Sequence, residues 1–334
     1  RPLDTPGTKG DDYMLEKNHI KIPGIRVGHA QDIKAATGCT VILCEEGAVA
    51  GVDVRGGAPG TRETDLLDPV NMVDRVHGIL LTGGSAFGLD AAAGIMQYLE
   101  QKDIGFDVEV TKVPIVSGAV LFDLTIGDFR VRPDKEMGYN ACVNSETDNW
   151  SEGNIGAGTG ATVGKLFGLG NSMKSGLGSY YIQVGDLIVG AIVAVNSFGD
   201  IVDPKNGNII AGALAEDGKT FVNSESFMIQ NYNEKNITGR NTSIGVVVTN
   251  AQMTKAQANK IASMAHDGYA RTMRPAHTMV DGDTIFALAT GRIPADINVV
   301  GVLAARTIEQ AVLRAVKEST TLYGIKCYKD LQVI

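Results

Sequence analysis

The apolar residues of this chain fall into short runs, the longest of which spans nine residues from Leu187 to Val195. A helix that crosses a bilayer needs about 18 or more such residues, so the sequence predicts no membrane partner and no membrane span. Short runs rich in β-branched residues are typical of buried strands. The runs Thr40–Cys44 and Ala48–Val54 are separated by Glu45-Glu46-Gly47, which predicts a hairpin.

Helical spacing is confined to a few segments. Residues 90–102 follow a glycine turn, and residues 254–273 and 298–318 are long enough for helices. Thr254 with Gln257 predicts a capping box at the start of the second helix. Three further runs have the length of strands: Val113–Leu121, Ile244–Val248 and Thr284–Ala289. The order lacks a regular βα alternation, which favours an α+β fold of sheets covered by helices over a barrel or a doubly wound sheet.

The charge and cysteine content exclude several classes of protein. The chain has 30 Lys and Arg against 38 Asp and Glu, a net charge of −8 without a basic block, so we expect no nucleic-acid partner. The cysteines form no CxxC pair and the histidines no HExxH, which predicts neither a disulfide framework nor a metal site. Residues 1–19 are polar and predict an arm before a single domain at 20–334. No secretory leader is visible, and we expect a cytoplasmic location.

The glycine-rich segment NIGAGTGATVGKLFGLG, residues 154–170, does not fit a phosphate-binding loop. It lacks the Ser or Thr that follows Lys in a Walker loop, and no strand-like run precedes its GxGxxA pattern. Lys165 is the one lysine in this apolar context, where desolvation would lower its pKa and suit it to catalysis. The alternative is a solvated lysine at the end of a loop.

A polar segment ends at Asn241, and Thr242 opens a β-branched run. Cleavage of the Asn241–Thr242 bond would give one residue both a hydroxyl nucleophile and an α-amine that can accept the hydroxyl proton. Two alternatives stay open here. Thr242 can be the first residue of a strand, or Asn241-Thr242-Ser243 can be a glycosylation site.

The pattern Asp281-Gly282-Asp283 directly precedes the predicted strand at Thr284. Two acids around a glycine are typical of a turn or of calcium ligands, although the rest of a calcium-binding loop is missing. Next to a nucleophile in space, the same carboxylates could orient it. His277 in the preceding loop is interpreted as structural, because Thr242 would not require a separate base.

Five motifs together resemble the DmpA-type family, which contains L-aminopeptidase/D-esterases, β-peptidyl aminopeptidases and endo-type nylon-oligomer (6-aminohexanoate oligomer) hydrolases. The likeness extends from about Ile20 to about Lys317. The motifs are VRGGAPGTRETDLLDP (Val54 to Pro69), LTGGSAFGLDAA (Leu81 to Ala92), NIGAGTGATVGK (Asn154 to Lys165), VAVNSFGD (Val193 to Asp200) and NTSIGVVVTNAQMTKAQANKIA (Asn241 to Ala262).

The resemblance implies an N-terminal-nucleophile αββα sandwich made as a precursor that cleaves itself between Asn241 and Thr242. The α chain would be residues 1–241 and the β chain residues 242–334, and family members commonly assemble such units into tetramers. Thr242 matches the family nucleophile, which is threonine in the nylon-oligomer branch and serine in the aminopeptidases. Asp281 and Asp283 match the aspartates of the nylon-oligomer branch, where aminopeptidases tend to carry Ser-x-Glu.

Three further positions match functional residues of relatives: Lys165, Asn196 and Tyr139. The resemblance implies that Lys165 keeps the amine of Thr242 neutral, that Asn196 donates to the oxyanion, and that Tyr139 lines the substrate site. The expected reaction is hydrolysis of a small amide or peptide-like substrate, endo-acting on ω-amino-acid oligomers, without a metal or organic cofactor. An exo-acting aminopeptidase is the rival within the family, and an uncleaved ligand-binding relative is the rival outside catalysis.

Overall fold

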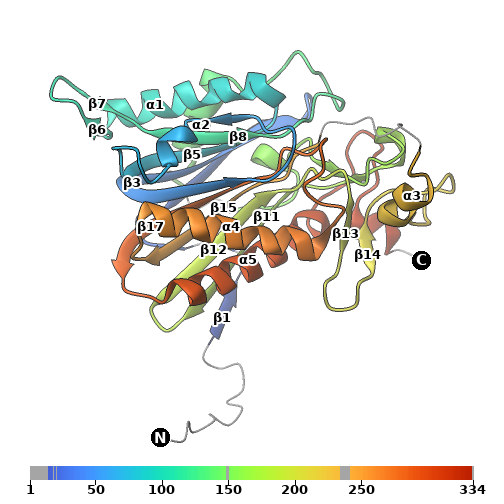
Figure 1. Cartoon of the computed structure of the whole chain (residues 1–334). Helices are drawn as coiled ribbons and strands as arrows, with labels where there is room; N and C mark the ends of the chain where they lie inside the picture. The colour runs from blue at the N-terminus through green and yellow to red at the C-terminus, as the bar shows by residue number, and fades with distance from the viewer. Residues whose placement is uncertain (1–13, 18, 20, 148–149, 234–240, 333–334) are drawn as a thin grey trace, which may run out of the picture.

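The computed structural model describes residues 14–17, 19, 21–147, 150–233 and 241–332 (Figure 1). Its helices are α1 (Ala91–Gln101), α2 (Lys135–Asn144), α3 (Ser224–Gln230), α4 (Lys255–Thr272) and α5 (Ile297–Lys317). Its strands are β1 (Met14–Lys17), β2 (Arg26–Asp32), β3 (Thr37–Val54), β4 (Thr61–Arg62), β5 (Arg75–Thr82), β6 (Phe106–Asp107), β7 (Lys112–Val113), β8 (Val116–Val120), β9 (Thr162–Val163), β10 (Met173–Lys174), β11 (Leu177–Val184), β12 (Leu187–Ala194), β13 (Asp200–Val202), β14 (Ile209–Ala211), β15 (Ile244–Ala251), β16 (Met273–Arg274) and β17 (Thr284–Ile293).

Ten strands form one hydrogen-bonded sheet that folds over along β3 into two packed layers. The strand order is β1-β11-β12-β15-β17-β3-β5-β8-β4, and β2 pairs with β3. Helices α4 and α5 cover the layer that contains β12, β15 and β17, whereas α1 and α2 cover the layer that contains β5 and β8 (Figure 1). The chain therefore has the αββα arrangement that the resemblance implied.

The continuous apolar runs are explained by strands that are buried on both faces. On β5, Ile79 and Leu81 point into the core between the two sheet layers, whereas Leu80 packs against the helical layer of α1. On β15, Val246 lies in the core between the layers, and Val247 packs toward α4 and α5. Alternate residues thus fill different cores, so the sequence shows no polar alternation.

The topology brings three distant segments together at one end of the sheet. Ala194 at the end of β12 pairs with Ile244 at the start of β15, and Ile244 pairs in parallel with Thr284 at the start of β17. The residues just outside these strand ends, 195–198, 241–243 and 281–283, therefore lie next to one another.

Two sequence predictions about local structure are wrong. Residues 40–54 are not a hairpin, because β3 runs without a turn from Thr37 to Val54. A register shift between Leu43 and Ala48 accommodates the Glu-Glu-Gly segment as an irregularity opposite β5. Within the expected arm, Met14–Lys17 form the edge strand β1 on β11, while residues 1–13 lie outside the described residues.

The prediction of the main helices is confirmed. In particular, Thr254 accepts a hydrogen bond from Gln257 N, and the Gln257 side chain accepts one from Thr254 N, which is the expected capping box of α4. Helix α5 occupies residues 297–317, one residue from the predicted bounds.

Candidate active site

Thr242 is buried at the converging strand ends, where 5% of it is exposed. Its hydroxyl donates to the carbonyl oxygen of Asn241, and Gly282 N donates to the same oxygen at 2.9 Å. The oxygen of the Asn241 carbonyl thus accepts from both a side-chain hydroxyl and a backbone N–H. An acyl-transfer step needs this combination of a nucleophile beside a carbonyl and a donor on the carbonyl oxygen.

Lys165 and Thr242 share one hydrogen-bond acceptor. The Nζ atom of Lys165 donates to the main-chain O and to Oδ1 of Asn196, each at 3.0 Å. Thr242 N donates to the same Asn196 main-chain oxygen at 3.0 Å. The lysine amine therefore lies beside the nitrogen that cleavage would turn into an α-amine.

The alternative of a solvated Lys165 is wrong, because only 9% of the residue is exposed. Burial lowers the pKa of Lys165 to about 7, while the negative charges of Asp281 and Asp283 act in the opposite direction. A lysine with this pKa exists in both protonation states near neutral pH, which distinguishes it from a surface lysine.

The side-chain amide of Asn196 has a fixed orientation. Its Oδ1 accepts from Thr162 N at 3.0 Å, and its Nδ2 donates to Phe122 O at 2.9 Å. The backbone donor and the backbone acceptor distinguish the two ends of the amide. Because Phe122 takes one N–H of Nδ2, the expected contact to an oxyanion would use the second one.

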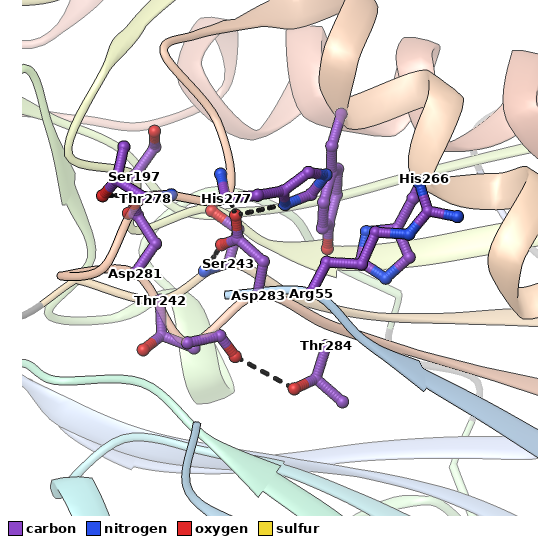
Figure 2. A network of polar contacts seen from close by, with 12 residues as sticks. Arg55, Ser197, Thr242, Ser243, His266, His277, Thr278, Asp281, Asp283 and Thr284 are labelled. Carbon is purple, nitrogen blue, oxygen red and sulfur yellow. Dashed lines mark hydrogen bonds and ion pairs between the residues drawn. The ribbon is translucent and has the colours of Figure 1, made fainter. Parts of the chain in front are cut away.

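The two aspartates hold the main chain of two segments that meet at Thr242 (Figure 2). Asp283 Oδ1 accepts from Ser243 N at 2.9 Å, and Asp281 Oδ1 accepts from Phe198 N at 3.1 Å. Burial, followed by the charge of Asp283, raises the pKa of Asp281 to about 6. The predicted orientation of the Thr242 hydroxyl by these carboxylates stays a prediction, since their recorded partners are main-chain nitrogens and the side chains of residues 277 and 278.

Tyr139 is not brought into this cluster. It lies on α2, where its hydroxyl donates to Gln101 on α1 at 2.8 Å and its ring packs at 5.8 Å against Tyr98. Its predicted substrate contact stays a prediction, and the single chain gives it no support.

Sequence reasoning missed several contacts of the site. Ser243 accepts from Asn196 N through its hydroxyl at 3.3 Å, and Thr278 donates to Asp281. A threonine three residues before an aspartate is a recognisable local pairing, so Thr278 could have been found. Gly282 contributes only its N–H to the Asn241 carbonyl, and a sequence gives no signal for that contact.

Within the described residues, no group of three or more His, Cys, Asp or Glu side chains is arranged to hold a metal ion. The four cysteines are buried and free. No helix in the described part of the chain is both long and apolar enough to cross a membrane.

Comparisons with known proteins agree over nearly the whole chain. An uncharacterized aminopeptidase of Mycobacterium leprae is 41% identical over 92% of this chain and 92% of its own length. A 6-aminohexanoate-oligomer endohydrolase of Kocuria sp. (strain KY2) is 31% identical over 90% of this chain and 86% of its own length.

A solved structure supports the fold. The L-aminopeptidase D-Ala-esterase/amidase of Ochrobactrum anthropi, described as a variant of the Ntn hydrolase fold, superposes with a TM-score of 0.65 at 17% identity. The match covers 89% of this chain and 85% of that one. The sequence signature of Peptidase family S58 matches residues 18–329. The chain therefore belongs to Peptidase family S58 and is an amide-bond hydrolase.

Proposed function

We propose that this protein cleaves itself between Asn241 and Thr242 and then uses Thr242 as an N-terminal nucleophile to hydrolyse linear amide oligomers such as 6-aminohexanoate oligomers. The observation that carries the proposal is the arrangement of two hydrogen-bond donors around the Asn241 carbonyl. The Thr242 hydroxyl contacts the Asn241 carbonyl, whose oxygen also accepts from Gly282 N at 2.9 Å.

Self-cleavage would begin with attack of Thr242 Oγ1 on the carbonyl carbon of Asn241. The C–N bond then breaks, the hydroxyl proton passes to the leaving nitrogen, and an ester joins Asn241 to the threonine oxygen. Water hydrolyses this ester, which leaves a carboxylate on Asn241 and a free α-amine on Thr242. The developing negative charge on the carbonyl oxygen would be stabilised by Gly282 N–H, a kind of contact worth about 3 to 4 kcal/mol in a model protease.

The free amine would then act as the base for an amide substrate. It would remain near the Asn196 carbonyl, which also accepts from Lys165 Nζ at 3.0 Å. A positive charge on Lys165 disfavours a second positive charge on the neighbouring amine, so it favours the neutral amine that can accept the hydroxyl proton. The acyl-threonine ester formed from the substrate would be hydrolysed by water, as in self-cleavage.

The substrate class rests on Thr242, Asp281 and Asp283, which match the nylon-oligomer branch, and on the 31% identity to a 6-aminohexanoate-oligomer endohydrolase. The rival candidate is an exo-acting aminopeptidase, which is favoured by the 41% identity to an uncharacterized aminopeptidase. An exo-acting enzyme needs an acidic group for the substrate ammonium.

The test compares the wild-type chain with Thr242→Ala on a denaturing gel and by mass spectrometry. We expect the wild type to give fragments of roughly 25 and 10 kDa, the shares of residues 1–241 and 242–334 in a 35.2 kDa chain. We expect Thr242→Ala to stay intact and inactive. Intact and active wild-type protein would refute the proposal.

Substrate choice is measured separately on the cleaved wild type. We expect release of shorter oligomers from 6-aminohexanoate oligomers, with products that include internal fragments. Turnover of amino-acid p-nitroanilides alone would favour the exo-acting aminopeptidase instead.

A further inference from the structure

His277 contacts the carboxylate that holds the residue after Thr242. Its Nδ1 lies 2.9 Å from Asp283 Oδ2, and its backbone N donates to the same oxygen at 3.1 Å (Figure 2). Asp283 is 1% exposed at its side chain, and that of His277 is 20% exposed. A buried carboxylate with donors on both oxygens is held in one orientation.

Asp283 in turn holds the main chain of Ser243 in place. Its other oxygen, Oδ1, accepts from Ser243 N at 2.9 Å, and Thr284 N donates to Ser243 O at 3.1 Å. Both polar groups of the Ser243 main chain are therefore fixed. After cleavage, Thr242 would be attached to the protein through Ser243 alone, so the position of the nucleophile would depend on this anchor.

We propose that His277 is a positioning residue for Thr242, acting through the hydrogen bond from its Nδ1–H to Asp283 and from Asp283 to the main chain of Ser243. This inference rests on the proposed function, because it concerns the same nucleophile.

The surroundings of the His277 ring assign its tautomer. The His266 ring packs against it at 4.8 Å, and the Tyr269 ring lies at 6.3 Å. The Nε2 atom of His277 is buried and has no partner among the described residues. A buried nitrogen without a proton is less costly than a buried N–H without an acceptor, so the proton belongs on Nδ1, where the carboxylate accepts it.

Several titratable groups lie near the His277 ring. Asp283 faces its Nδ1, and the His266 ring packs against the ring of His277. The Nε2 atom of His266 lies 2.9 Å from Asp53 O. Burial is the largest cause of the lowered pKa of His266, the hydrogen bond to Asp53 O acts in the opposite direction, and the neighbouring His277 and Arg55 add to the lowering.

The backbone conformation of His277 determines which variants are informative. Its φ is 59°, in the left-handed region, which Gly, Asn and Asp tolerate well and Ala does not. The Nδ2 atom of Asn occupies the same place along the side chain as Nδ1 of His. His277→Asn therefore keeps a donor to Asp283, whereas His277→Asp has the same shape and places a carboxylate there, and His277→Gly removes the side chain.

The experiment measures kcat and KM on 6-aminohexanoate oligomers, and the rate of self-cleavage, for these three variants. We expect His277→Asn to stay within about threefold of the wild type, and His277→Gly and His277→Asp to lose at least about tenfold in kcat or in self-cleavage with KM nearly unchanged. Glu109→Gly is the matched control, because Glu109 is an exposed left-handed residue with φ 69°. We expect it to behave as the wild type.

Two results would overturn the proposal. One is wild-type kcat and self-cleavage in both His277→Gly and His277→Asp, and the other is equal losses in His277→Asn and His277→Asp. If His277→Gly does not fold, the comparison of the isosteric variants His277→Asn and His277→Asp still tests the proposal.

A second readout does not depend on activity. In uncleaved Thr242→Ala protein labelled with ¹⁵N-histidine, we expect His277 to carry its proton on Nδ1. A proton on Nε2 with a bare Nδ1 would overturn the proposal even if the wild type proved to be inactive. The proposed function itself is tested by comparing the wild type with Thr242→Ala. Its failure is therefore distinguishable from failure of the inference about His277.

Discussion

Replacing Lys165 by Met should stabilise the uncleaved chain while it removes the amine that lies beside Thr242. Methionine is unbranched and of similar length, so it can fill the same space without a charge. Asn196 keeps donors to both of its oxygens, from Thr242 N and from Thr162 N, whereas Ser197 O loses the contact from Lys165 at 3.4 Å. We expect the Thr242→Ala background to prevent the proposed cleavage, so that folding can be measured on one chain.

The magnitude follows from the pKa of Lys165, which burial lowers from 10.5 to about 7. The folded pKa lies below the unfolded one, so the unfolded chain binds more protons between pH 7 and 10.5, and the contribution of Lys165 to stability rises with pH in this window. With 1.36 kcal/mol per unit, its burial costs about 4 kcal/mol at pH 7 and about 2 kcal/mol at pH 9. The lost contact to Ser197 costs about 1 to 3 kcal/mol. Lys165→Met should therefore gain about 1 to 3 kcal/mol at pH 7, and this gain should shrink by about 2 kcal/mol at pH 9.

The assay is urea unfolding of Thr242→Ala with and without Lys165→Met at pH 7, 8 and 9, with the free energy of unfolding extrapolated to water. Lys174 is a matched control, because burial also lowers its pKa to about 7, but its amine donates to Gly158 O and Ala161 O. The stability gained by Lys174→Met should shrink between pH 7 and pH 9 in the same way. A stability difference for Lys165→Met that is as large at pH 9 as at pH 7 would refute the reasoning.

Three further predictions concern the carboxylates and the helices. The initial rate of self-cleavage should fall below about pH 6, because the pKa of Asp281 is raised to about 6 and its carboxylate is expected to act in the ionised form; a flat rate from about pH 5 to 8 would contradict this. Tyr139→Phe should change kcat by less than about twofold, since the hydroxyl bonds to Gln101, and a large rise in KM would instead place Tyr139 at the substrate. Gly94→Ala should lower the free energy of unfolding by about 1 to 3 kcal/mol in urea titrations, because its Cβ would lie 1.9 Å from Lys135 O between α1 and α2.

The parts of the fold that depend on local pattern could be predicted from the sequence. The Thr254 cap and the period of α4 are local, and both were correct. The hairpin at residues 40–54 was wrong because two acids and a glycine are typical of a turn, whereas β5 offers partners on both sides of the irregularity in β3. Pairing with a distant strand overrides such a local signal.

The candidate site was harder to predict from the sequence than the fold, as Lys165 and Lys174 illustrate. Sequence reasoning selected Lys165 for its glycine-rich, apolar surroundings, yet Lys174 is buried more completely, and its pKa is lowered to the same value of about 7. The two lysines differ in which atoms accept hydrogen bonds from their amines. Lys174 donates to the main chain of the glycine-rich segment, whereas Lys165 donates to the oxygen that also binds Thr242 N. Burial alone therefore cannot identify a catalytic lysine.

The Asn196 carbonyl explains why a strand end suits this chemistry. The ladder between β12 and β15 ends at Ala194 and Ile244, so two residues further out the main chain of Asn196 can bind groups other than a neighbouring strand. Its oxygen accepts from Thr242 N and Lys165 Nζ at once. An amide nitrogen can only donate there, whereas a neutral amine can donate to the same oxygen and still offer a lone pair to its own hydroxyl. We therefore expect that cleavage would create the base without moving the nitrogen. We also expect the charge of Lys165 to favour the neutral amine only below the pH at which Lys165 loses its proton.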